Sequence, residues 1–99
     1  MTKEEENYFK EVGVYLLREV PNKGICGLVR FAFTVGLCYG MTTDDFQFYE
    51  GRYCFPLGID AVTALAEWDG IGDPAGNWIK HKGGIGEYSN PNYEKQLES

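Results

Sequence analysis

The chain has 99 residues, of which 43% are hydrophobic and 15% aromatic, and its formal net charge is −6. This length suits one domain rather than two, and this hydrophobicity excludes a disordered chain. The acidic balance, without a run of basic residues, disfavours direct binding to nucleic acid and favours basic partners. We therefore expect a single domain over residues 1–99, with a frayed tail from about residue 90.

The first predicted element is a helix over residues 2–20. Thr2 can cap its N-terminus, because Glu5 stands three residues later, as a capping box requires. Pro21 then ends the helix, and residues 22–24 form a turn. The apolar side chains that recur with helical spacing are Phe9, Val12, Leu16 and Val20.

Two strands are predicted next. Residues 28–41 alternate large and small side chains, which is typical of a strand with one large-residue face. A turn over 42–45 leads to a partner strand over 46–55, whose apolar phase slips at Glu50 and Gly51. Either a bulge or a turn between two short strands explains the slip. The large face of the first strand consists of Phe31, Phe33, Val35, Leu37, Tyr39 and Met41.

A second helix is expected to begin with Asp60 as its cap and to end at Asp69-Gly70. Its short amphipathic face consists of Ala61, Val62, Ala64, Leu65 and Trp68. Residues 69–99 are predicted to form an irregular Gly-rich loop, with a short strand over 78–81. The predicted fold is α+β, with two helices packed on one side of a short antiparallel sheet.

Cys26, Cys38 and Cys54 form no CxxC pair, and the N-terminus lacks the apolar run of a signal peptide. No stretch is long and apolar enough to cross a membrane. These features predict a cytoplasmic protein with reduced thiols. Cys38 and Cys54 lie in apolar, strand-like sequence and are interpreted as small core residues.

The segment EWDGIGDPAGNWIKHKGGIG, residues 67–86, holds both tryptophans and the only histidine. It is no EF-hand, because Asp69, Asp73 and Asn77 are spaced by four and Lys80 stands where the twelfth ligand should be. It lacks the GxxxxGK[ST] pattern of a phosphate loop, and one histidine supplies too few zinc ligands. No metal and no cofactor are predicted.

Trp68 ends an apolar helical face and is interpreted as a core residue, whereas Trp78 stands on irregular sequence beside basic residues. A rigid indole beside a cation is typical of an interface anchor, although a core role is the alternative. The predicted protein-binding residues are Asp73, Trp78, Lys80, His81 and Lys82 in the Gly-rich loop, with Asp44, Asp45 and Glu50 in the acidic turn.

Two other functions stay open. The first is a small enzyme or ligand-binding domain in which Cys54 is the nucleophile, His81 its base, and Asp69 or Asp73 the orienting carboxylate. The second is a self-associating module, such as a homodimer, that pairs through a sheet edge or the tyrosine-rich segment 87–93.

Residues 50–84 carry an RYCF strand, a short alanine-rich helix ending in WDG, and the loop GDPAGNWIKHKG. This segment resembles small proteins encoded by bacteriophages of Gram-negative bacteria. The resemblance implies no catalytic residue. It implies an accessory protein that binds a host protein in the bacterial cytoplasm, such as a counter-defence inhibitor of the anti-CRISPR or anti-restriction type.

Overall fold

The computed structural model describes residues 1–45, 47–84 and 86–93. Residues 94–99 of the predicted frayed tail lie outside this part. The elements are α1 (Lys3–Glu11), β1 (Tyr15–Val20), β2 (Gly24–Arg30), β3 (Val35–Tyr39), β4 (Gly51–Phe55), α2 (Gly58–Glu67), β5 (Lys80–Gly83) and β6 (Gly86–Ser89). A third, very short helical segment follows at 91–93.

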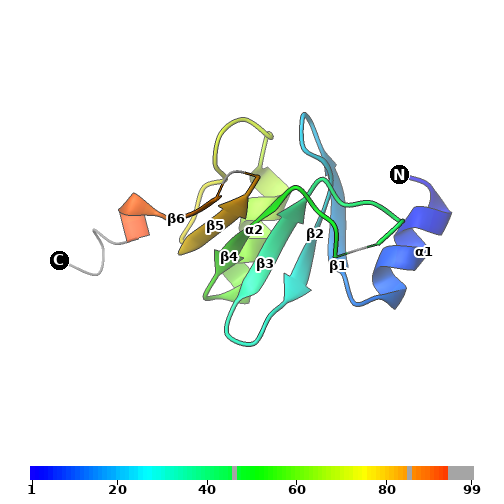
Figure 1. Ribbon diagram of the computed structural model, residues 1–99, viewed down its shortest axis with the longest axis horizontal. Helices are drawn as coiled ribbons and strands as arrows, with labels where there is room; N and C mark the ends of the chain where they lie inside the picture. Colours follow the sequence, from blue (N-terminus) through cyan, green and yellow to red (C-terminus); the bar gives the residue numbers. More distant parts are fainter. Residues whose placement is uncertain (46, 85, 94–99) are drawn as a thin grey trace.

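The six strands form one antiparallel sheet in which each strand pairs with the next along the chain. Figure 1 shows this order from β1 beside α1 to β6 beside the C-terminus, with α2 against the back of the sheet. The predicted α+β class is confirmed. The predicted numbers of strands and helices are too small, because the described residues form six strands and three helical segments.

The predicted helix over 2–20 is correct at its start and wrong at its end. The capping box between Thr2 and Glu5 is present, but α1 ends at Glu11. Gly13 follows at φ 97°, a left-handed conformation that breaks the helix. The segment after it pairs with β2 as β1, so the predicted helical face is split between two elements.

The predicted single strand over 28–41 is wrong, because this segment contains the end of β2, a turn and all of β3. A turn over 31–34, closed by the bond from the Phe31 N–H to the Thr34 carbonyl, separates β2 from β3. The predicted strand over 46–55 is also shorter, because β4 begins only at Gly51, where the pattern slips. Residues 41–50 form a loop in the described part of the chain.

The second helix begins two residues before the predicted cap. Leu57 is the N-cap of α2 and makes no side-chain capping bond, so Asp60 lies in the first turn instead of capping it. At the other end, the Arg18 guanidinium donates to the carbonyls of Leu65 and Trp68. The predicted loop after α2 contains two strands: β5 begins two residues after the start of the predicted strand over 78–81, and β6 is not predicted.

The sheet has a hydrophobic cluster on each face. We call the face that carries Leu37, Tyr39 and Tyr53 the α2 face, because buried residues of α2 pack against it. The opposite face carries Cys38, which packs with Phe9 of α1 in a second cluster. The two helices therefore do not share one side of the sheet, as predicted. Alternating strand residues point to opposite faces, so each strand serves both clusters.

The three cysteines are buried free thiols, which confirms Cys38 and Cys54 as small core residues. Burial raises the pKa of Cys26 to about 11 and that of Cys38 to about 12. The thiolate, which is the reactive form, is therefore scarce at neutral pH for these two residues. No helix in the described part of the chain has the length and apolar character needed to cross a membrane.

Candidate functional site

Four polar aromatic side chains from consecutive strands meet on the α2 face: Tyr39 of β3, Tyr53 of β4, His81 of β5 and Tyr88 of β6. The register places His81 between Tyr53 and Tyr88 as direct neighbours. The imidazole stacks on the Tyr53 ring at 4.1 Å, and its Nε2 lies 2.8 Å from the Tyr39 hydroxyl. We call these four residues, together with Asp73, the ring network.

The absence of a side chain at Gly51 of β4 leaves space for the Tyr39 ring of the ring network. Gly51 faces the Tyr39 ring, and a Cβ at Gly51 would collide with the Tyr39 hydroxyl. The phenol therefore reaches across β4 to the histidine on β5. A larger residue at this position of β4 would break the bond between Tyr39 and His81.

Asp73, in the loop after α2, joins two members of the ring network. Its Oδ1 accepts the hydroxyl of Tyr53 at 2.7 Å and that of Tyr88 at 2.6 Å. Burial, and then the bond to Asp73, raise the pKa of Tyr53 far above its usual value and that of Tyr88 to about 12. Both phenols stay protonated and act as hydrogen-bond donors at neutral pH.

Burial lowers the pKa of His81, and the Lys23 charge lowers it further, against an opposing effect of Asp73. The imidazole is therefore neutral at pH 7. Its Nδ1 is buried without a hydrogen-bond partner among the described residues. Lys23 reaches the network from the β1–β2 turn, with Nζ 5.2 Å from the Tyr39 ring centroid. Neutral phenols and a neutral imidazole make this network a stable layer of rings.

Trp78 is part of this layer. Its side chain is only 3% exposed, its Nε1 donates to the Pro74 carbonyl, and its ring meets Tyr53 edge-on. An interface anchor must be accessible, so the predicted exposed anchor at Trp78 is wrong. Trp68 is equally buried and packs edge-on against Tyr39, in agreement with its predicted core role.

The alternative enzyme site is not assembled. Cys54 pairs with Lys80 and Tyr53 pairs with His81, so the thiol and the imidazole project from opposite faces of the sheet. A Cys54–His81 dyad is therefore not formed. Of the two predicted orienting carboxylates, Asp73 lies beside the ring network, whereas Asp69 accepts the backbone N–H of Ile71.

The other predicted binding residues divide between surfaces. Lys80 and Lys82 project from the face opposite His81, and Lys80 forms an ion pair with Glu87. Glu50 lines a hollow together with Lys82, so the structure brings one residue of the acidic turn close to the basic strand. Asp44 and Asp45 lie in the 41–50 loop, where the Asp45 carboxylate accepts the N–H of residue 47.

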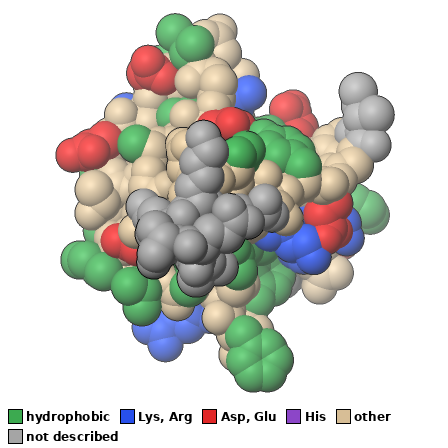
Figure 2. Space-filling view, turned by 90° about the vertical axis from the view of Figure 1, so that its left-hand side faces the viewer, with side chains coloured by type: hydrophobic (Ala, Val, Ile, Leu, Met, Phe, Trp, Pro, Cys, Tyr) green, Lys and Arg blue, Asp and Glu red, His purple; other side chains and the backbone are tan. Residues whose placement is uncertain are grey.

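An apolar, acidic surface over α2 and its following loop is not among the sites predicted from the sequence. Leu57, Ile59 and Ile71 are 58%, 70% and 72% exposed. Residues 53–79 contain four acidic residues and no Lys or Arg. We call this the α2 surface: Leu57, Asp60, Ile59, Glu67, Asp69, Ile71 and Asp73. In Figure 2 hydrophobic and acidic side chains lie along the left side of the view, with Lys or Arg side chains above and below them.

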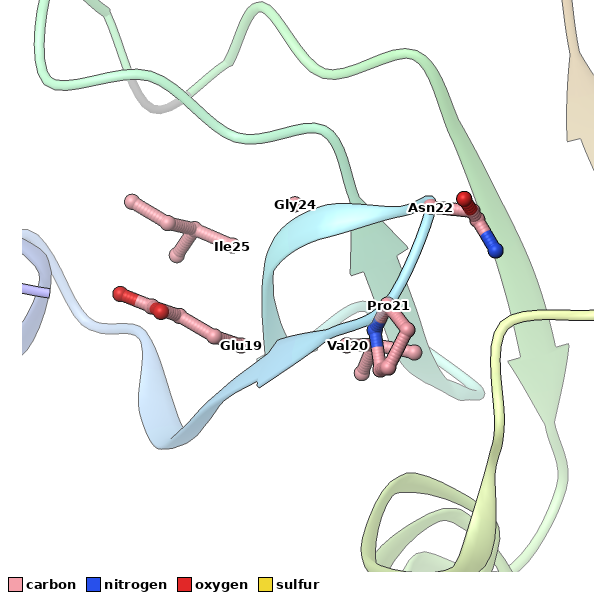
Figure 3. A pocket seen from close by; sticks show the side chains of 6 residues that line it. All are labelled: Glu19, Val20, Pro21, Asn22, Gly24 and Ile25. Atoms are coloured by element: carbon pink, nitrogen blue, oxygen red, sulfur yellow. The ribbon is translucent and has the colours of Figure 1, made fainter.

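A further hollow lies along the β1–β2 hairpin. Figure 3 shows that Glu19 and Ile25, which are paired across the strands, point the same way, whereas Val20 and Pro21 point elsewhere. The Glu19 carboxylate is paired with the N-terminal amino group of Met1. The polar groups do not converge on a common point, so this hollow offers no arrangement for chemistry.

Within the described residues, no group of three or more His, Cys, Asp and Glu side chains is placed to hold a metal ion. Comparison of the chain with protein families, with curated proteins and with solved structures finds no match. The phage resemblance of residues 50–84 stays a prediction.

Proposed function

We propose that this protein acts by binding a partner protein through the α2 surface. From the resemblance of residues 50–84 to phage proteins, we further propose that the partner is a protein of a bacterial host and that binding inhibits it, as a counter-defence inhibitor does. The binding function is the one predicted from the sequence, but the proposed contact surface is α2 and the start of the loop after it. Of the predicted binding residues, only Asp73 belongs to this surface.

The observation that carries the proposal is the exposure of Leu57, Ile59 and Ile71 on one helix and its flanking segments. An exposed Leu or Ile gains about 1.5–3 kcal/mol when a partner covers it fully. Single exposed apolar residues are ordinary, but several on one helix and its flanking segments are typical of an interaction surface. Phe33, which is 93% exposed, lines a hollow with Arg30 and Pro56 next to the start of α2.

Charge indicates which partner fits. Asp60, Glu67, Asp69 and Asp73 lie on the same segment as the apolar side chains, and residues 53–79 contain no Lys or Arg. Opposite charge on the partner speeds association, and like charge disfavours wrong partners. We therefore expect an apolar patch rimmed by Lys and Arg on the partner. Such a rim is common on proteins that bind nucleic acid.

The first experiment is an affinity capture from bacterial lysate with the tagged protein, followed by mass spectrometry. Three baits are compared: the wild type, the double variant Ile59→Ser/Ile71→Ser, and the control Phe48→Ser. Phe48 is as exposed as Ile71 but lies in the 41–50 loop. Polar substitutions at exposed positions usually change stability by less than about 0.5 kcal/mol, so all three baits should fold.

We expect one protein to be retained by the wild type and by Phe48→Ser, and lost with the double variant. Binding of that purified protein should weaken as salt rises, because the rim charges are screened. Equal retention by all three baits would refute the α2 surface as the binding site. A wild type that captures nothing, and whose mass in solution doubles with concentration, would favour self-association instead.

A further inference from the structure

The opposite face of the sheet is only partly covered. Cys38, near the middle of the sheet, packs with α1, whereas α2 lies on the other face. Further along, β4 and β5 place three cations on this opposite face: Arg52, Lys80 and Lys82. The protein as a whole is acidic, with a net charge of −6, so a local group of basic residues is unusual in it.

Two of these cations are unfavourable neighbours. Arg52 and Lys82 are directly opposite in the β4–β5 register, and like charges in this position destabilise a sheet. Lys82 is exposed and forms no ion pair with any described residue. The Nε of Arg52 is buried without a hydrogen-bond partner in the described chain. Glu87 lies opposite Lys82 on β6, and one guanidinium nitrogen of Arg52 donates to the Tyr49 hydroxyl. An anion between Arg52 and Lys82 would bond to their remaining donors and reduce the repulsion between them.

A hollow of 290 Å³ lies at this pair. Arg52, Lys82 and the turn residues Gly83 and Gly84 line it, together with Glu50. A Cβ at Gly84 would meet open space, so the backbone of the turn is accessible to a ligand. Phosphate groups are commonly held by this combination of cationic side chains and Gly-lined backbone.

A second hollow, of 350 Å³, adjoins the first. The two hollows share Gln47 and Tyr49, and the second is completed by Val29 and Phe31. The Phe31 ring lies over Gly36, where a Cβ would collide with it, and 4.4 Å from the Arg52 guanidinium carbon. This hollow is therefore lined by aromatic and apolar groups, with one amide for hydrogen bonding.

We propose that the joined hollows bind a mononucleotide. Its phosphate lies between Arg52 and Lys82 against the turn at Gly83. Its base lies against Tyr49 and the edge of Phe31, because the Arg52 guanidinium covers a face of the Phe31 ring. The Gln47 amide bonds the edge of the base. The Glu50 side chain, which lies over Gly40 at the edge of the hollow, accepts hydrogen bonds from ribose hydroxyls. This site lies on the face opposite α2, so it is independent of the α2 surface.

The test is a titration of ¹⁵N-labelled protein with AMP, GMP, CMP and UMP, followed by amide chemical shifts. Adenosine and inorganic phosphate serve as half-ligands, and a short single-stranded DNA serves as a polymeric ligand. The variant Lys82→Ala removes one phosphate contact and one repulsive charge, so it should fold. Lys10→Ala, on the exposed side of α1, is the charge-matched control.

We expect at least one mononucleotide to shift the amides of Gln47, Tyr49, Lys82 and Gly83, and to bind more tightly than either half-ligand. Lys82→Ala should weaken this binding about tenfold or more, and Lys10→Ala less than about twofold. The proposal is overturned by the absence of shifts at millimolar nucleotide, or by equal binding to the Lys82→Ala variant. Tighter binding of the DNA than of every mononucleotide also overturns it, in favour of a single-strand site.

Discussion

Asp73→Ala is the sharpest test of the ring network, because one carboxylate oxygen accepts two phenol protons. Asp73 itself is exposed, so its removal leaves no cavity in the core. The two phenols respond differently to the loss of this acceptor. Tyr53 is 3% exposed and its hydroxyl is left without a partner, whereas Tyr88 is 44% exposed and its hydroxyl can return to water.

The expected cost comes from this difference in exposure. A buried hydroxyl left without its partner costs about 1–3 kcal/mol, and a bond to a solvated phenol is worth less than about 1 kcal/mol. We therefore expect Asp73→Ala to lower the free energy of unfolding by about 2 kcal/mol, most of it through Tyr53. For a domain of this size, that corresponds to a fall in Tm of roughly 8–16 °C.

The assay is urea unfolding of two double-mutant cycles, Asp73→Ala with Tyr53→Phe and Asp73→Ala with Tyr88→Phe. The coupling energy should be about 1–2 kcal/mol in the first cycle and below about 0.5 kcal/mol in the second. Asp73→Asn, which keeps a carbonyl acceptor, should recover part of the loss. A cost below about 0.5 kcal/mol for Asp73→Ala, or a larger coupling with Tyr88, would refute the reasoning.

Two further predictions concern the same part of the fold. Gly70→Ala should lower stability by more than about 2 kcal/mol, because Gly70 has a φ of 82° and a Cβ there would collide with the Pro21 carbonyl. Gly72→Ala, at φ 62° in open space, should cost only about 1 kcal/mol, and equal costs in thermal unfolding would contradict the clash. Because burial lowers the pKa of His81 below 6.5, the unfolded chain takes up this proton more readily, and stability should fall as pH drops below about 6.5. Urea unfolding at about pH 7.5 and about pH 5.5 should show a smaller loss for His81→Gln, and an equal loss would show that His81 is not responsible.

The sequence predicts the structural features that depend on residues close together in the chain. Thr2 and Glu5 form the capping box, and the apolar alternation of 35–39 marks β3. It does not predict β1, because Leu16 and Val20 also fit a helical period. The strand forms only by pairing with β2, and Leu16 takes a φ of 54°, unusual for a side chain of this kind. The PNKG segment, interpreted as a helix stop, is also a hairpin turn signal.

The ring network could not be found from one sequence for a related reason. Tyr39, Tyr53, His81 and Tyr88 lie on four different strands and meet only through the registers of three strand pairs. The segment KGGIG fits a turn between two short strands, but its glycines fit an irregular loop equally well. The α2 surface also gave a signal, namely the absence of Lys and Arg from 53–79.

The β4–β5 register connects the ring network with the proposed nucleotide site. Tyr53 and His81 stack on the α2 face, and the neighbouring pair, Arg52 and Lys82, is thereby set on the opposite face. A slip of one residue would exchange these faces, placing cations against the buried tryptophans and rings in water. The stack is therefore more than core packing. It offsets the cost of placing two cations opposite each other, and it keeps them where an anion can reach them.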